Sequence, residues 1–297
     1  MVRTQFGIKD LENLSNVKAH TIRIWEKRYN LLNPDRTDTN IRKYDLESLK
    51  KLLNIVYLYN KGHKISTLAS LNNHELQQLV KENIQDLNPE YAGTILKTAM
   101  FEFDEELFDT TLAKLLEQKS FREVFSSVFV PLLNEAGVLW QCGTIDPSHE
   151  HFISEKIKQT IIQQCNIAKE ATRKETTKTF ALYLPQEEIH EIGLLYANYE
   201  LLKAGYKTIY LGANIPLESL NHMLTTKKDV TFVTYFTVRP EQDQLENYIL
   251  NFQEVVSAIS PCELWILGRK SSKNSKYSKN IKLFNDINLF VQQIENI

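Results

Sequence analysis

The chain has 297 residues, of which 42% are hydrophobic and 24% are charged, and its formal net charge is −2 at pH 7. This is enough chain for two or three domains with their own cores. No apolar run approaches the roughly 18 residues of a membrane-spanning helix, and the N-terminus lacks the pattern of a signal peptide. The three cysteines have no paired spacing, which excludes a disulfide framework or a cysteine zinc site. We therefore expect a soluble, cytoplasmic protein with no membrane partner.

The charge is unevenly distributed along the chain. Residues 1–70 carry 13 lysines and arginines against 7 aspartates and glutamates, whereas the remainder carries 22 against 30. A basic segment on an acidic body indicates a polyanionic partner for the first 70 residues alone.

The N-terminal segment has the pattern of a helix-turn-helix. An amphipathic helix is predicted over 6–14, a turn at 15–17 and a second, basic helix over 18–29. The polar stretch 30–44 predicts a two-stranded wing. Residues 45–71 predict two further helices, separated at Lys61-Gly62.

The string TIRIWEKRYNLLNPDRTDTNIRKYDLESL, which begins at Thr21, resembles the winged-helix DNA-binding domain of the MerR family. That resemblance implies a dimer that places one helix of each copy in the major groove of a palindromic double-stranded DNA operator, with the wing on phosphates. The residues that would face DNA are Lys18, Thr21, Arg23, Lys27, Arg28, Tyr29, Arg36, Arg42 and Tyr44.

Three neighbours of these residues have structural interpretations. Trp25 either faces DNA or, as we favour, packs the helix onto the small core. Glu26 is expected to orient a neighbouring arginine. Asn40 stands where the family usually has glycine in the wing turn, and asparagine tolerates the left-handed backbone that such a turn needs.

MerR activators usually continue into a long coiled-coil helix, but no heptad run follows here. Residues 72–89 indicate a linker and one short helix. A homodimer or higher oligomer must therefore form through another part of the chain.

The middle of the chain, residues 90–175, shows helical apolar patterns and no strand. Helices are predicted over Tyr91 to Phe103, Glu105 to Glu117, Phe121 to Gln141 and His149 to Lys169.

Trp140-x9-Glu150-His151 resembles the four-helix cap over the upper face of cobalamin in light-sensing transcriptional regulators, and more distantly in methionine synthase. The resemblance implies that Trp140 lies over the upper axial ligand of adenosylcobalamin and that Glu150 and His151 line the adenosyl pocket. In the alternative interpretation Trp140 is an ordinary packing residue, and the acid and histidine form a polar helix start. Zinc at His149 and His151 is disfavoured because no third ligand has suitable spacing.

The C-terminal part begins with a strand–loop–helix–strand unit. An apolar strand over 180–184 is followed by a polar loop to His190, a helix from Ile192 and a second strand over 208–211. This order is typical of a doubly wound parallel sheet, in which ligands bind at the carboxyl ends of the strands. The imidazole of His190 is therefore placed where it can meet a ligand.

Glu188-x-His190-x-x-Gly193 resembles the cobalamin-binding signature, with glutamate where aspartate is usual. The resemblance implies that His190 coordinates cobalt from below and that Glu188 orients the imidazole. Gly193 would permit close approach of a large flat ligand. The alternative is a surface histidine on an ordinary loop.

Further landmarks of that family are only partly matched. Gly212 lies in a matching turn after the second strand, and Thr234, with Thr237 second, stands for a serine or threonine that ends the third strand. Gly268 retains one of two glycines that admit the nucleotide tail, but Arg269 replaces the other. Gln141 follows Trp140 where some light-sensing members have histidine.

The predicted protein is multidomain: a winged helix-turn-helix (1–72), an all-α four-helix cap (73–175) and an open five-stranded Rossmann-like α/β domain (176–297). The resemblances imply a DNA-binding regulator, expected to be a repressor, controlled by adenosylcobalamin bound between cap and sheet. Light would break the cobalt–carbon bond and dissociate the oligomer from DNA. The alternative is a regulator that senses cofactor level without light, or whose sheet is a cofactor-free scaffold. An enzyme is disfavoured because the chain has no room for a catalytic barrel.

Overall fold

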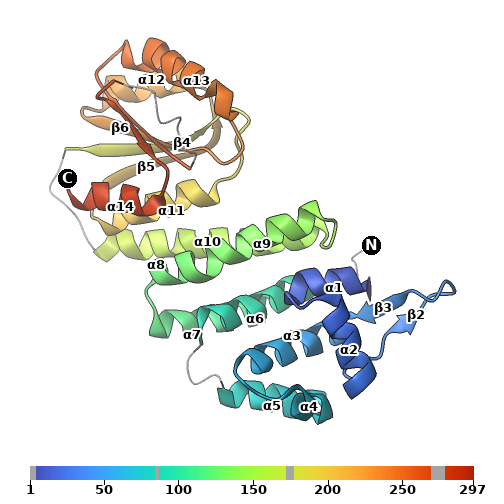
Figure 1. Ribbon diagram of the computed structural model, residues 1–297. Helices are drawn as coiled ribbons and strands as arrows, with labels where there is room; N and C mark the ends of the chain where they lie inside the picture. Colours follow the sequence, from blue (N-terminus) through green and yellow to red (C-terminus); the bar gives the residue numbers. More distant parts are fainter. Residues whose placement is uncertain (1–4, 84–86, 172–176, 269–277) are drawn as a thin grey trace. The chain divides into compact units, whose positions relative to one another are not determined.

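The chain forms two units, Met1–Lys156 and Ile157–Ile297, in the computed structural model, which describes residues 5–83, 87–171, 177–268 and 278–297 (Figure 1). The domain boundaries predicted at residues 72 and 175 remain predictions, and residue 175 itself lies outside the described ranges. None of the described helices is both long and apolar enough to cross a bilayer.

The N-terminal helices and wing form as the sequence predicts. Helices α1 (Ile8–Ser15) and α2 (Ala19–Tyr29) each end at an asparagine in the left-handed conformation. The wing strands β2 (Asp35–Arg36) and β3 (Arg42–Asp45) pair antiparallel. Asn40 has φ 63°, which confirms the left-handed wing turn.

One strand of this domain is not apparent from the sequence. β1 (Gln5–Phe6) pairs with β3, so that β3 is the central strand of a three-stranded sheet. Two residues are too few to show an alternating pattern. Helices α3 (Leu46–Asn60), α4 (Ile65–Ser70) and α5 (Asn73–Asn83) follow the wing.

The helical region follows the predicted order with one difference. Its elements are α6 (Pro89–Glu102), α7 (Glu105–Gln118), α8 (Phe121–Val124), α9 (Val130–Gln141) and α10 (Pro147–Ala171). The helix predicted over 121–141 contains a π-helical turn at Phe125–Phe129. Pro131, in the first turn of α9, has no N–H to donate, which favours such an irregularity before it.

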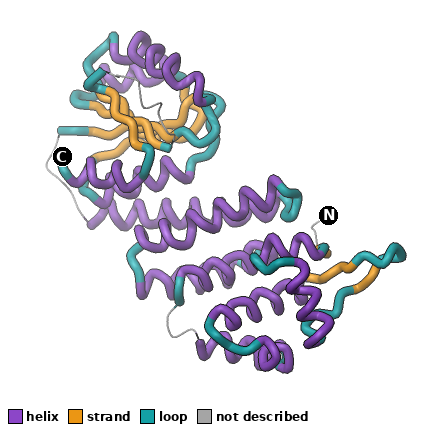
Figure 2. Tube along the Cα trace, viewed as in Figure 1, coloured by secondary structure: helices purple, strands orange, loops and turns teal. Residues whose placement is uncertain are grey.

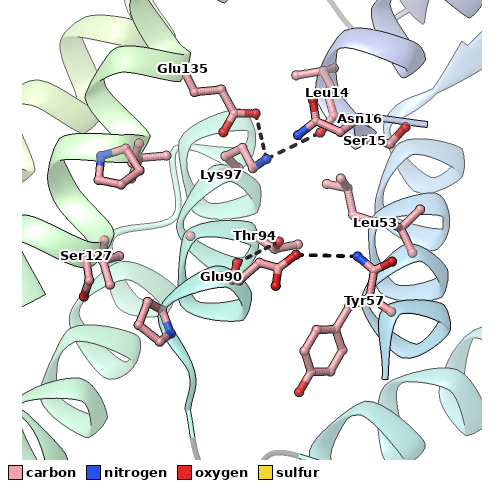
Figure 3. A pocket seen from close by; sticks show the side chains of 17 residues that line it. Leu14, Ser15, Asn16, Leu53, Tyr57, Glu90, Thr94, Lys97, Ser127 and Glu135 are labelled. Carbon is pink, nitrogen blue, oxygen red and sulfur yellow. Dashed lines mark hydrogen bonds and ion pairs between the residues drawn. The ribbon is translucent and has the colours of Figure 1, made fainter. Parts of the chain in front are cut away.

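Within Met1–Lys156 the winged helix packs on the helical region. The rings of Phe6 and Phe101 meet edge to face at 5.6 Å. The buried Nζ of Lys97 on α6 donates to Glu135 Oε1 at 2.8 Å and to the Leu14 carbonyl at 3.4 Å. Figure 3 shows this lysine at a pocket of about 230 Å³. Lys97 thus joins α6 to α9 by an ion pair and to the end of α1 by a hydrogen bond.

The C-terminal unit is built on a parallel sheet of order β5-β4-β6-β7-β8, which confirms the predicted five strands. The strands are β4 (Thr179–Pro185), β5 (Lys207–Ile215), β6 (Val230–Tyr235), β7 (Glu263–Leu267) and β8 (Ile281–Phe284).

Helices cover both faces of this sheet, as Figure 2 shows. One apolar core includes α12 (Leu217–Thr226) and α13 (Leu245–Phe252), and the other includes α11 (Ile192–Lys203) and α14 (Ile287–Glu295). The strand order reverses beside β4. The loop that follows β4 therefore lies at the switch point where such sheets bind ligands.

Candidate functional site

Most of the predicted DNA-facing side chains lie on the surface of α2 and the wing. Lys18, Arg23, Lys27, Arg28 and Arg36 are exposed, and Thr21, Tyr29 and Arg42 are partly buried. This surface presents guanidinium and ammonium groups suited to phosphates and base edges.

The prediction that Tyr44 faces DNA is wrong. Its side chain is buried, and its hydroxyl donates to Glu26 Oε1 at 2.7 Å. The alternation of β3 turns this ring toward the small core. Glu26 also accepts from Arg42 Nε at 3.1 Å, which confirms that it orients an arginine. Trp25 is buried against Tyr59, which confirms the packing role.

The loop after β4 contains a carboxylate surrounded by hydrogen-bond donors. Glu188 is fully buried, and its Oε1 accepts from the backbone N–H of Ile189 and of His190, each at 3.0 Å, and from His190 Nδ1 at 2.5 Å. Its Oε2 accepts from three successive amides of the segment 237–239, at 2.7 to 3.1 Å. The single carboxylate therefore joins the β4 loop to the loop after β6.

These contacts keep Glu188 ionised. Burial by itself raises the pKa of the carboxyl group, but the amides of Arg239 and Val238 and the bonds from His190 outweigh it, and the pKa falls to about 2. A carboxylate can only accept, so His190 Nδ1 carries the hydrogen. Nε2 is then the nitrogen that can coordinate a ligand, on a side chain that is 51% exposed.

The residues singled out in the helical region differ in exposure and in their contacts. Trp140, in the last turn of α9, is 51% exposed, which argues against a role in packing alone. Glu150 accepts from Ser154 Oγ at 2.9 Å, and His151 is exposed. His149 is buried, with its ring stacked on Phe103 at 4.9 Å, so it belongs to the core.

Comparison with known proteins identifies two families in this chain. Residues 6–75 match the MerR HTH family regulatory protein family, and residues 94–163 match the B12 binding domain family. The chain contains a MerR-type helix-turn-helix and a B12 binding domain. The resemblances of the N-terminal segment and of the helical cap are thereby confirmed, whereas the signature at 188–193 lies outside both matched ranges.

Two transcription regulators of Myxococcus xanthus are similar to the chain over most of its length. It is 28% identical over 256 residues to the HTH-type transcriptional repressor CarH, which covers 82% of this chain and 83% of that protein. It is 22% identical over 240 residues to the HTH-type transcriptional repressor CarA, with coverage of 80% and 78%.

A solved structure shares the fold. The monomethylamine corrinoid protein of Methanosarcina barkeri superposes with a TM-score of 0.53 at 11% identity, and the match covers 68% of this chain and 93% of that one. At this level of identity the likeness concerns the fold alone.

At the carboxyl edge of the sheet, His190 and Glu188 are suited to provide the lower ligand of cobalamin. Thr234 is fully buried at the end of β6, and its Oγ1 has no hydrogen-bond partner among the described residues, a buried polar atom that a ligand could satisfy. The turn predicted at Gly212 is wrong, because β5 continues to Ile215 and Gly212 pairs with Tyr183 of β4 at an irregularity in the register. Its φ of +85° is a conformation that favours glycine. Thr237 contributes its backbone amide to Glu188.

The space beside Gly193 and Gly268 is too small for a nucleotide tail in this structure. An ideal Cβ on Gly193 would lie 2.6 Å from the ring of Tyr235, and one on Gly268 would lie 2.7 Å from it. We expected Gly193 to leave room for a large flat ligand, but the chain's own tyrosine takes that room. The pattern at 188–193 gave no signal of this contact, which joins segments distant in sequence. Arg269 lies outside the described residues.

Proposed function

We propose that the chain is a DNA-binding transcriptional repressor controlled by cobalamin. The observation that carries the proposal is the buried Glu188 bonded to His190 Nδ1 at 2.5 Å, on a loop at the switch point of the sheet. A carboxylate in this position fixes the imidazole tautomer and increases the basicity of Nε2, as metal-binding histidines require. The MerR-type domain and the similarity to two repressors support DNA as the partner.

The chain's own residues would divide the work. His190 would coordinate cobalt, and Glu188 would hold its ring. Trp140, Glu150 and His151 would contact the upper ligand. The exposed tryptophan supports this, because a large apolar side chain at a surface gains free energy when a ligand covers it.

We further propose adenosylcobalamin as the cofactor and light as the signal. Bound adenosylcobalamin supplies a cobalt–carbon bond that light cleaves. Loss of the upper ligand would expose Trp140 to water again and would shift the population away from the DNA-binding oligomer. That oligomer, a homodimer or larger, would present paired α2 helices to a palindromic operator, with the gain of avidity that two half-sites provide.

A second candidate function is cofactor sensing without light. The observation that favours it is Gln141, whose exposed carboxamide is a weak cobalt ligand beside Trp140. After photolysis no strong ligand would replace the adenosyl group from this position.

One experiment tests both candidates. The protein is mixed with adenosylcobalamin in darkness, desalted, and its visible spectrum is recorded before and after illumination. We expect a retained spectrum that changes with light. A retained but unchanged spectrum would support the second candidate.

His190→Ala should lose the cofactor on desalting, whereas His222→Ala, which removes an exposed histidine of α12 in the same unit, should retain it. Equal retention by both variants would refute coordination by His190. A colourless wild-type protein would refute cobalamin control altogether.

A further inference from the structure

Tyr235 is wedged between two glycine backbones at the carboxyl edge of the sheet. It is the last residue of β6, and its ring lies against Gly193 in the first turn of α11 and Gly268 at the end of β7. An added Cβ at either glycine would come within 2.7 Å of the ring, closer than real Cβ atoms approach other atoms, and one at Gly268 would also lie 2.5 Å from the carbonyl oxygen of Phe236. The two glycines and the tyrosine therefore form one filled slot.

This slot adjoins the histidine of the proposed cofactor site. Gly193 is three residues after His190. Tyr235 is two residues before Thr237, whose backbone amide donates to Glu188. Strand alternation places Tyr235 on the face of the sheet that α11 and α14 cover, where it packs against the apolar core of that face.

The chemistry of the cofactor makes the slot consequential. A cobalamin whose cobalt takes a protein imidazole as its lower ligand has released its own benzimidazole, and the nucleotide tail that carries this base must then lie on the same side of the corrin as the histidine. Bare glycine backbone next to the imidazole is suited to such a tail, because no side chain occupies it. In this protein the ring of Tyr235 occupies that space.

We propose that Tyr235 is a specificity-determining residue that closes the nucleotide-tail slot, so that a corrinoid with a tail binds only after the ring has left. The inference rests on the proposed function, because it presupposes a corrinoid on His190. Displacement of an aromatic ring from an apolar contact weakens binding by roughly tenfold to a hundredfold, according to how much of the ring is re-exposed. A corrinoid without a tail does not incur this cost.

The experiment compares aquacobalamin with diaquacobinamide, which has the same ring and metal but no nucleotide tail. The full-length protein and the variants Tyr235→Ala and Tyr235→Leu are titrated with each compound in darkness, and dissociation constants are obtained from the visible spectrum. We expect Tyr235→Ala to bind aquacobalamin about tenfold more tightly than wild type or better. Diaquacobinamide affinity should change by less than about threefold, within the scatter of a substitution that removes no ligand contact.

For each ligand, the dissociation constant of a variant is compared with that of wild type. The benzimidazole of aquacobalamin competes equally in all aquacobalamin titrations, so it does not affect this comparison. Tyr235→Phe retains the ring and should retain the wild-type ratio of the two constants. Diaquacobinamide binding also reports whether a variant is folded. If Tyr235→Ala fails this check, Tyr235→Leu, which keeps an apolar side chain while shortening it, decides the question.

The outcomes separate this inference from the proposed function. A gain for aquacobalamin alone supports the closed slot. If wild type binds no aquacobalamin and Tyr235→Ala binds it, the closed slot is supported and cobalamin control of the wild-type protein is refuted. Binding of aquacobalamin by wild type with no gain in the folded variants overturns the role of Tyr235 and leaves cobalamin control standing. Absence of binding of either corrinoid by wild type and variants overturns both.

Discussion

Replacement of Glu188 by glutamine tests the contact on which the candidate site depends. The carboxylate accepts from Ile189, from His190 at two nitrogens, and from the three amides of 237–239. A glutamine side chain has only one acceptor oxygen. Whichever way the amide is oriented, its NH₂ group faces three buried N–H donors, which then have no acceptor.

The magnitude follows from the pKa. The difference between the ordinary value of 4.5 and the value of about 2 in the folded protein corresponds to about 3 kcal/mol of stability. Loss of one partner of a buried charged contact costs a similar amount, about 3–5 kcal/mol. Because the folded pKa is depressed, this contribution is fully present above about pH 4.5 and is lost as the pH falls through about 2.

Hydrogen exchange measured by mass spectrometry provides the assay. Peptides that cover residues 237–239 should exchange about a hundredfold faster in Glu188→Gln than in wild type at neutral pH, because about 3 kcal/mol of protection is lost. Glu187→Gln is the matched control: it removes the same charge from an exposed neighbour. If exchange in 237–239 were the same in wild type and in both variants, the view that Glu188 holds this segment would be refuted.

Three other substitutions test the remaining parts of the chain. Glu26→Gln should destabilise the winged helix by about 1–3 kcal/mol, because glutamine has one acceptor oxygen and leaves either the buried Tyr44 or the partly buried Arg42 without an acceptor; a thermal unfolding midpoint equal to that of wild type would contradict this. Burial lowers the pKa of His149 below 6.5, although Asp146 opposes the shift. Stability from the neutral imidazole is therefore present above about pH 6.5 and lost below it, and His149→Gln should flatten this pH dependence of the unfolding temperature. Arg23→Ala should weaken binding to an operator selected from random DNA and reduce the salt slope by about 1, as titrations at several salt concentrations would reveal; an unchanged slope would remove this arginine from the phosphate contacts.

Local pattern predicted most elements of this protein, although not β1 or the π-helical turn at Phe125–Phe129, and it did not predict the surroundings of every side chain. Helices α2 and α11 and the wing turn at Asn40 were predictable, because helical periodicity and left-handed tolerance are properties of neighbouring residues. The burial of Tyr44 was not, since the string that resembles MerR proteins does not say which face of a four-residue strand meets the core. Only the pairing of β3 with β1 and β2, and the acceptor on Glu26, decided it.

The sequence by itself determined that a histidine with a nearby acid follows a buried strand, and that a basic helix-turn-helix precedes it, because both are encoded by spacing within short segments. Tertiary structure alone decided what surrounds that histidine. The amides of 237–239 reach Glu188 from some 50 positions along the chain, and Tyr235 reaches Gly193 across the sheet. Such contacts arise when parallel strands bring their carboxyl ends to one edge, and spacing within a short segment does not encode them.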